Sequence, residues 1–324
     1  MKNLRKSIGI AAIAIAASLT LGACSSASTS TPATPAPSDS ATQKPADGGF
    51  AAPGDDDKGG KNNPVKIGVV GASGPQWATL ESLANENGIY LDLVDFTDYQ
   101  QPNPQLDAGD LDLNQFQHIL FLAQYNNESG SDLAAIGSTA IYPLGLYSQD
   151  YDSVDAIPDG SKIAVPNDGT NQARALGVLQ SAGLITLNSG VGALVATPED
   201  IDTATSRVEV VPVAADQTAR SLADKQIAGA IINNDYVADT GLEPTAAIAK
   251  DDPAADASKP FINIWASRAQ DATNPVYLKL VELAQTAEVE ADLQENSGGT
   301  AVLVHSTPEE LAAYLADARS QLKS

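Results

Sequence analysis

The residue types that most often perform catalysis or bind metals are scarce in this chain. Its 324 residues include one cysteine, Cys24, and two histidines, His118 and His305. One cysteine excludes a disulfide framework and a cysteine-ligated zinc site, and two histidines nearly exclude a histidine-cluster metal site. The sequence contains no Walker A motif, dinucleotide fingerprint or G-x-S-x-G nucleophile elbow. We therefore predict no catalytic residues, no metal and no cofactor.

One polar loop has the residues to bind an anion. It follows a predicted strand over 162–165 and leads into a predicted helix. Thr170 or Asn171 could cap that helix, which would leave backbone N–H groups of its first turn for a carboxylate or phosphate. Arg174, one turn further on, could add a bidentate ion pair to the same anion. On this segment alone, a surface arginine beside a capped helix is an equal alternative.

Two further groups of side chains stand near predicted strand ends. Tyr99, Phe116 and His118 place two aromatic rings and an imidazole there, in a chain that is only 5% aromatic. Considered alone, Phe116 fits a core position better, and His118 fits a hydrogen-bonded position on a helix. Asn233 and Asn263 lie against buried strands, where an unpaired amide costs about 1–3 kcal/mol. Each must therefore bond the backbone or a bound polar solute.

The elements that must position these side chains alternate between strand and helix from residue 64 onward. Repeated βα units favour an α/β fold with mostly parallel sheets covered by helices on both faces, in which ligands bind beyond the carboxyl ends of strands. About 260 folded residues suggest two lobes of this kind. The expected strands are 65–70, 89–96, 111–113, 133–136, 141–147, 162–165, 208–213, 228–232 and 261–266, and the expected helices are 76–87, 116–125, 171–182, 218–226, 275–294 and 308–322.

The first 23 residues have the features of an export signal. Three basic residues precede an apolar run over 8–21, which is short for a membrane-spanning helix of about 20 residues. Small residues then lead to Cys24, and this ending resembles a bacterial lipobox, whose cysteine receives a diacylglyceryl group. An ordinary signal peptide with a chance cysteine is the alternative. We predict a lipoprotein signal over 1–23 and a lipid anchor on Cys24 at the extracytoplasmic face of the cell membrane.

Residues 24–63 predict a disordered tether. They are rich in Ser, Thr, Ala, Pro and Gly, and such a composition buries too little apolar area to offset the entropy of ordering. The acidic run Asp55–Asp57 lacks the spaced ligands and closing glutamate of a calcium loop, so we interpret it as solvated.

The charge balance argues against a nucleic-acid partner. Lys and Arg total 18 whereas Asp and Glu total 41, so the net charge is −23. A nucleic-acid-binding protein needs a basic face that neutralises phosphates. Attachment of this acidic chain to an anionic membrane must therefore come from its lipid, not from its charge.

Several segments resemble signature segments of the methionine-binding lipoproteins of ABC importers, the NlpA lipoprotein family. The likeness runs from about residue 65 to residue 302 in the family's order and includes the lipobox. It implies a non-catalytic, two-lobed periplasmic-binding-protein fold of type II-like architecture, with the ligand cleft between the lobes. It also implies that the lobes close on L- or D-methionine, or on a methionine-containing dipeptide, for delivery to a membrane permease with its ATPase. The segments are 96–104, 114–118, 142–148, 157–176 and 231–236.

The resemblance also implies a role for each candidate side chain. Arg174 would pair with the ligand carboxylate, and Asn171 and the helix amides would lie beside it. Asn233 would bond the backbone of the amino acid, and Asn263 would reach the same end. A thioether gains about 0.3–1.5 kcal/mol from each contact with an aromatic ring. The pocket for the ligand side chain would be lined by Tyr99, Phe116 and His118.

The chain departs from the family pattern at several positions. Tyr142 stands where the family has a glutamate, Asp235 stands at the second asparagine of Asn-Gly-Asn-Tyr, and Gly169 replaces a usual proline. The arginine and the first asparagine are retained, which supports recognition of an amino acid. The choice between methionine and a near relative stays open.

These inferences give an expected organisation. Lobe one would comprise 64–142 and 268–324, and lobe two 147–262, with crossovers near 142–146 and 263–268 as the hinge. Two other interpretations remain open: a surface interaction lipoprotein with a vestigial cleft, and a binding protein for a methionine-containing dipeptide or another amino acid.

Overall fold

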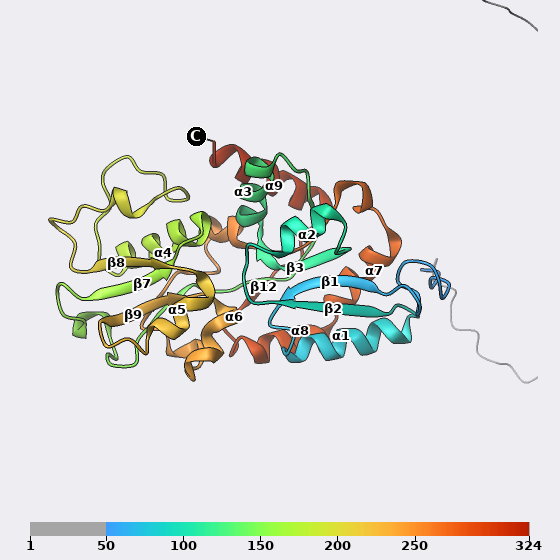
Figure 1. Ribbon diagram of the computed structural model, residues 1–324, viewed down its shortest axis with the longest axis horizontal. Coiled ribbons are helices and arrows are strands. Elements are labelled where there is room, and N and C mark those ends of the chain that lie inside the picture. Colours follow the sequence, from blue (N-terminus) through green and yellow to red (C-terminus); the bar gives the residue numbers. More distant parts are fainter. Residues whose placement is uncertain (1–49, 324) are drawn as a thin grey trace, which may run out of the picture. The chain divides into compact units, whose positions relative to one another are not determined.

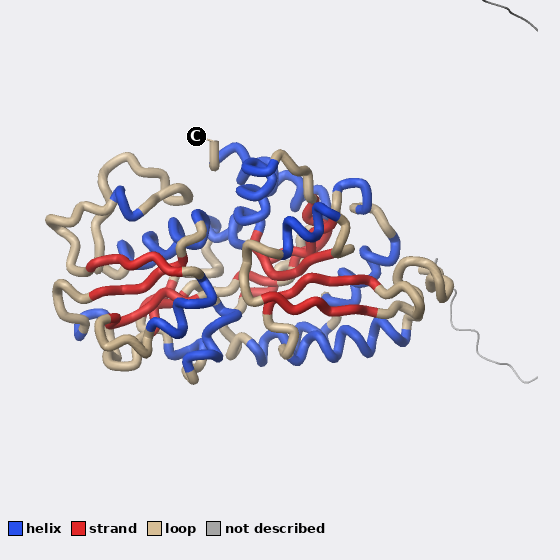
Figure 2. Tube along the Cα trace, in the orientation of Figure 1, coloured by secondary structure: helices blue, strands red, loops and turns tan. Residues whose placement is uncertain are grey.

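The computed structural model describes residues 50–323, which belong to one compact unit, Gly49–Ser324. Two five-stranded sheets lie in two lobes, and Figure 2 shows their strands as separate groups. The strand order is β2-β1-β3-β11-β4 in lobe one and β10-β6-β9-β7-β8 in lobe two. The two-lobed α/β fold predicted from the sequence is confirmed. The predicted signal, Cys24 and the tether up to residue 49 lie outside the described residues.

Lobe one is a mixed sheet between two layers of helices (Figure 1). Its strands β1 and β2 are parallel, as are β1 and β3, whereas β11 runs antiparallel between β3 and β4. The strands are β1 (Val65–Val70), β2 (Leu91–Phe96), β3 (Leu113–His118), β4 (Ala134–Ser138) and β11 (Asn263–Ser267). One face packs on α1 (Pro75–Glu86), α7 (Pro275–Ala284) and α8 (Ala287–Asn296), and the other on α2 (Pro102–Ala108), α3 (Ile119–Ser129) and α9 (Pro308–Gln321).

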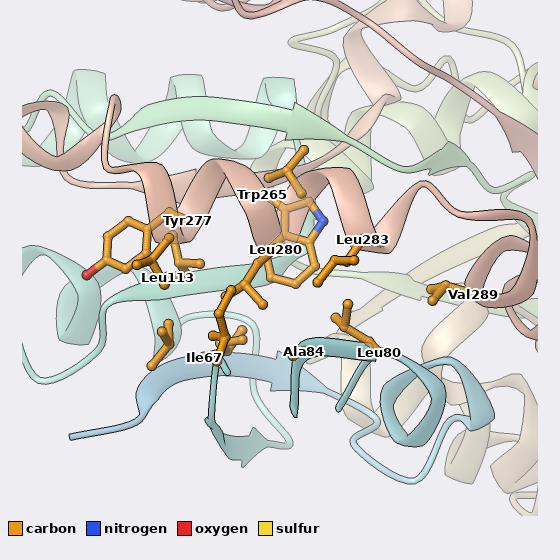
Figure 3. Close-up of a cluster of buried hydrophobic side chains, with 14 of the residues drawn as sticks. Ile67, Leu80, Ala84, Leu113, Trp265, Tyr277, Leu280, Leu283 and Val289 are labelled. Atoms are coloured by element: carbon orange, nitrogen blue, oxygen red, sulfur yellow. The ribbon is translucent and has the colours of Figure 1, made fainter. Parts of the chain in front are cut away.

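The core on the α1 side of lobe one is continuous from sheet to helices. Figure 3 shows Ile67 and Trp265 from the sheet packing against Leu280 of α7. The Trp265 ring lies edge-on to Trp77 of α1, with centroids 5.9 Å apart. Burial of such side chains contributes about 1.5–3 kcal/mol each, so this core gives the cleft a rigid support.

Lobe two repeats the plan with a smaller sheet. Strands β8, β7 and β9 are parallel, β6 pairs antiparallel with β9, and β10 pairs antiparallel with β6. Its strands are β6 (Gly145–Tyr147), β7 (Lys162–Pro166), β8 (Glu209–Val213), β9 (Ile227–Ile232) and β10 (Ala249–Lys250), and its helices are α4 (Gly169–Ser181), α5 (Ala215–Ser221) and α6 (Asn234–Val237). A two-stranded pair, β5 (Ala140–Ile141) and β12 (Val302–Leu303), lies near the first crossover.

The second crossover between the lobes lies earlier in the chain than predicted. Strand β11 pairs with β3 and β4, so residues 263–267 belong to the sheet of lobe one. The prediction of a hinge over 263–268 is therefore wrong, and the crossover runs through the residues between β10 and β11. A single strand that enters a sheet antiparallel from the other lobe cannot be recognised from its own apolar pattern.

Residues 50–63 are part of lobe one, so the tether prediction is wrong for this segment. Phe50 packs against the lobe-one core, and Lys58 Nζ lies 2.9 Å from Asp112 Oδ2. The segment is closed by backbone hydrogen bonds, among them Tyr90 N to Gly59 O at 2.8 Å. At Gly60 an added Cβ would lie 1.9 Å from the carbonyl oxygen of Gly54, so only glycine fits. Residues 50–63, whose composition predicts a linker, thus form an ordered segment on lobe one, which we call the strap.

Several helix boundaries also differ from the prediction. The helix expected over 275–294 is two helices, α7 and α8, and the helix expected from residue 116 starts at Ile119. Helix α2 was not predicted; Pro102 opens it, and Gly109 with φ +85° closes it. Within residues 50–323, no helix combines the length and apolar character needed to cross a membrane.

Candidate functional site

The two lobes line a cavity of about 40 Å³. Lobe one contributes the loop after β2, the end of β3 and the start of β11, and lobe two contributes the first turns of α4 and the turn between β9 and α6. Ligands in α/β sheets bind at such carboxyl ends of strands. The structure brings all seven candidate ligand-binding residues to this cavity: Tyr99, Phe116, His118, Asn171, Arg174, Asn233 and Asn263.

His118 ends β3 and caps α3, where the sequence pattern placed it inside a helix. Its Nδ1 accepts a hydrogen bond from Phe121 N at 3.1 Å, which identifies Nδ1 as the unprotonated ring nitrogen. The proton is therefore on Nε2, which donates to Asn171 Oδ1 at 3.3 Å. Burial, aided by the nearby Arg174 charge, lowers the pKa of His118 to about 3. His118 thus lines the cavity as a neutral ring.

Asp168 caps α4, although Thr170 or Asn171 was expected there. Its Oδ1 accepts hydrogen bonds from Asn171 N at 3.0 Å and Asn171 Nδ2 at 2.9 Å. The backbone amide of Gln172 donates to Asp168 O at 2.8 Å. The prediction that first-turn amides remain for a ligand anion is therefore wrong for Asn171, because Asp168 Oδ1 already accepts from its amide, whereas the Gln172 bond is the ordinary first backbone bond of the helix.

The same bonds fix the orientation of the Asn233 amide. Asn171 Nδ2 points at the Asp168 carboxylate, so Asn171 Oδ1 faces His118 and Asn233. Asn233 Nδ2 donates to Asn171 Oδ1 at 2.9 Å. Asn233 Oδ1 is then buried in the cavity wall without a hydrogen-bond donor among residues 50–323. Because an unpaired buried acceptor costs about 1–3 kcal/mol, this atom is poised to accept a donor from a ligand.

Arg174 is buried, which rules out the surface-arginine alternative. Its side chain is 6% exposed, its Nε donates to Asp251 Oδ2 at 2.6 Å, and its Nη2 donates to Tyr142 O at 2.7 Å. The guanidinium also lies 4.2 Å from the ring centroid of Phe261. Three contacts hold the fork rigidly. Within residues 50–323, Nη1 has no acceptor, so its two N–H groups remain for a ligand.

Aromatic rings form the opposite wall. Tyr99 lies against Phe116 and Phe121, with ring centroids 5.9 Å and 6.2 Å away. Tyr236 of lobe two extends the cluster, with its centroid 5.1 Å from that of Tyr99. Two hydrogen bonds cross between the lobes here: Tyr99 O–H to Asp235 Oδ2 at 2.7 Å, and Tyr236 O–H to Thr97 O at 2.9 Å. These contacts hold the lobes together.

Comparison with known proteins decides the family. Residues 65–304 match the sequence profile described as NlpA lipoprotein. The chain belongs to the NlpA lipoprotein family. It is 39% identical over 230 residues to the D-methionine-binding lipoprotein MetQ of Salmonella typhimurium, with 70% of this chain and 83% of that protein covered.

Solved structures that resemble this NlpA-family chain include substrate-binding proteins. The substrate-binding protein of a methionine transporter from Streptococcus pneumoniae superposes with a TM-score of 0.69 and 37% identity, covering 74% of this chain and 95% of that one. A nutrient-binding protein from Burkholderia cenocepacia, solved bound to methionine, gives a TM-score of 0.67 and 34% identity, covering 74% and 99%. The fold of this NlpA-family protein is therefore that of a substrate-binding protein.

Sequence reasoning missed three side chains that shape the site of this NlpA-family protein. Phe121 contributes a ring from α3, Asp251 pairs with Arg174, and Asp235 lines the cavity. Enclosure by the two lobes raises the pKa of Asp235 to about 6, and the hydrogen bond from Tyr99 partly opposes this shift. More than a third of the Asp235 surface is nevertheless exposed, so solvent moderates this shift. The only signal for Asp235 was its departure from the family's asparagine.

The cavity of this NlpA-family protein combines polar groups at one end with rings at the other. Among residues 50–323, no group of three or more His, Cys, Asp or Glu is placed to hold a metal ion. The donors on Arg174, the acceptor on Asn233 and the rings around Tyr99 are suited to a small molecule with a charged head and an apolar tail.

Proposed function

We propose that this protein is a lipid-anchored substrate-binding protein of an ABC importer and that it captures methionine or a close relative. The observation that carries the proposal is the cavity between the lobes, which is lined both by a rigid arginine with two uncommitted N–H groups and by aromatic rings. The relatives named D-methionine-binding lipoprotein and the homologous structure bound to methionine support it.

The head of the ligand would be held by polar groups of lobe two. The Nη1 donors of Arg174 would bond the carboxylate, and Asn233 Oδ1 would accept from the amino group. Asn263, at the start of β11, would reach the same end from lobe one. A zwitterion that leaves water needs such partners, because an unpaired buried charge is strongly unfavourable.

The tail of the ligand would lie among the rings of lobe one. A thioether is polarizable, and each sulfur–aromatic contact contributes about 0.3–1.5 kcal/mol. Phe116 and Phe121 meet edge to face at 5.8 Å, so their geometry is fixed before a ligand arrives. The cavity volume of about 40 Å³ is far below the roughly 300–1,000 Å³ of occupied small-molecule sites, so the lobes would have to separate to admit the ligand.

Transport would require partners that this chain does not contain. A ligand that contacts both lobes stabilises their closed arrangement through those differential contacts. A membrane permease would then recognise the closed form, and its ATPase would hydrolyse ATP, so this chain itself would not be an enzyme. The lipid on Cys24 would keep the protein at the extracytoplasmic face of the membrane.

Two measurements test the proposal. Native mass spectrometry of the purified protein should show a bound molecule with the mass of methionine or a close relative. Titration calorimetry with L-methionine, D-methionine and a methionine-containing dipeptide should show saturable binding of at least one of them, with norleucine as the control that lacks sulfur. Absence of any bound solute and of heat with every form would contradict the proposal and favour the surface interaction lipoprotein.

A further inference from the structure

The turn between β9 and α6 presents two acceptors that have no donor among residues 50–323, one of them buried and the other on an exposed residue. Asn233 Oδ1 is buried and unpartnered, as described above. Asp235, two residues further on, uses Oδ2 for the hydrogen bond from Tyr99, and Oδ1 has no donor among residues 50–323. Both side chains line the same cavity. Their arrangement calls for a ligand group that donates several hydrogen bonds.

The charges of the cavity wall do not balance. Arg174 is the one permanently charged cation there, and Asp251 already pairs with it at 2.6 Å. His118 is neutral because its Nδ1 accepts a hydrogen bond and its surroundings disfavour a second proton. No cation of the described residues pairs with Asp235. An ionised Asp235, which keeps contact with solvent, therefore leaves the cavity with one uncompensated negative charge, which attracts a cationic group.

We propose that Asp235 is a specificity-determining residue that makes a positively charged nitrogen on the ligand a condition of binding. Together with Asn233 Oδ1 it accepts from the ligand's ammonium group, so the site takes zwitterionic amino acids and rejects analogues in which a hydroxyl replaces the amine. This inference rests on the proposed function and extends it, because it names the charge state that the site selects.

A purely structural role for Asp235 makes a different prediction. If the carboxylate served only to hold the lobes together through Tyr99, then any acceptor at position 235 would do. In Asp235→Asn the side chain keeps an oxygen that accepts from Tyr99 O–H and loses only the negative charge. The substitution thus separates the charge from the contact between the lobes.

Titration calorimetry at pH 7.5 tests the inference with two ligands, L-methionine and its hydroxy analogue. We expect the wild-type protein to prefer methionine by roughly 100-fold, and Asp235→Asn to reduce that preference by about 10-fold or more, because a hydrogen bond to a charged group contributes this much. The control is Asp239→Asn, an exposed aspartate of the same region that does not line the cavity, which should keep the wild-type preference.

The wild-type protein supplies a second test that needs no variant. Acidification from pH 7.5 to pH 5 neutralises Asp235, whose pKa is about 6, so the affinity for methionine should fall while that for the hydroxy analogue stays constant. Burial raises the pKa values of Tyr99, Tyr142 and Tyr236, which face Asp235, so these side chains stay protonated throughout. Other acids lie near this group: Asp168, whose pKa is raised by burial and which faces Tyr99 and bonds Asn171, Asp98 and Asp216, which face Tyr236, and Glu243 in the adjoining cleft.

The outcomes distinguish the two proposals. Methionine binding with an unchanged preference in Asp235→Asn, or with no loss at pH 5, would overturn the role of Asp235 and leave the proposed function standing. Failure of the wild-type protein to bind any methionine form would overturn the proposed function, and the inference with it. A preference that collapses in Asp235→Asn but not in Asp239→Asn would support both.

Discussion

The wall that lobe one gives to the cavity and the wall that lobe two gives are built by different means. Lobe one contributes rings such as Phe116 and Phe121, which need only packing to stay in place. Lobe two contributes Arg174 and Asn233, each held by hydrogen bonds to further polar side chains. Apolar walls are specified by shape, whereas polar walls need a continuous set of partners. The polar half should therefore be the more sensitive to substitution.

The largest expected effect is that of Arg174→Ala. It removes the carboxylate partner and leaves Asp251 without its cation, and loss of one member of such a pair costs about 2–5 kcal/mol, so methionine affinity should fall about 30-fold or more in calorimetry. The matched control is Arg207→Ala, a lobe-two arginine that pairs with Asp159 at 2.8 Å on the surface. Affinity within twofold of wild type for Arg174→Ala, with an unchanged melting temperature, would remove this arginine from the site.

The second effect concerns pH and stability, because His118 and Asp235 have pKa values shifted in opposite directions. The pKa of His118 falls from 6.5 to about 3 on burial. The unfolded chain therefore binds the proton first, and stability is lost as pH falls below 6.5. From pH 6.5 to pH 5 the loss from His118 should be about 2 kcal/mol. Asp235, whose pKa is raised to about 6, gains stability as pH falls through 6 and partly offsets this loss.

Urea unfolding of His118→Gln and Asp235→Asn at pH 7 and pH 5 separates the two contributions. His118→Gln should lose less stability on acidification than the wild-type protein, and Asp235→Asn should lose more. The same measurement thus tests the wall of lobe one with His118→Gln and the wall of lobe two with Asp235→Asn. If the free energy of unfolding fell equally between pH 7 and pH 5 in the wild-type protein and both variants, neither His118 nor Asp235 would have the shifted pKa given above.

The smallest effect is expected on the apolar wall, for Phe116→Leu. Leucine keeps an apolar surface but loses the ring, and with it about 0.3–1.5 kcal/mol of contact with a thioether. Methionine affinity should fall about 2- to 10-fold, whereas norleucine, which has no sulfur, should lose less. The ratio of the two affinities, measured by calorimetry, is the readout. An equal loss for both ligands would indicate that the ring contributes only volume.

Most of the site could be predicted because its residues follow strands in recognisable segments. Asn171 and Arg174 share a loop and helix whose pattern is visible in the sequence, and β1 occupies the predicted residues 65–70. The partners of these residues were not predictable. Asp251 lies 77 positions from Arg174 in the sequence, and the fold brings the two side chains together. Its acidic surroundings in the sequence predict an exposed segment and give no sign of this pairing.

The errors have related causes. Phe116 and His118 were assigned to a helix, because the short apolar run at the end of β3 continues without a break into α3. The strap over 50–63 reads as a linker because its closure depends on Tyr90 and Asp112, which are remote in sequence. Local composition describes the conformations that a segment allows, and distant partners decide among them.

The strap over 50–63 also determines which lobe the described chain enters first. Phe50 and Lys58 fasten the entry of the chain to lobe one, whereas lobe two is joined covalently only through its two crossovers. The described chain therefore enters through lobe one, and lobe two is the part that would be displaced from it if the lobes separated.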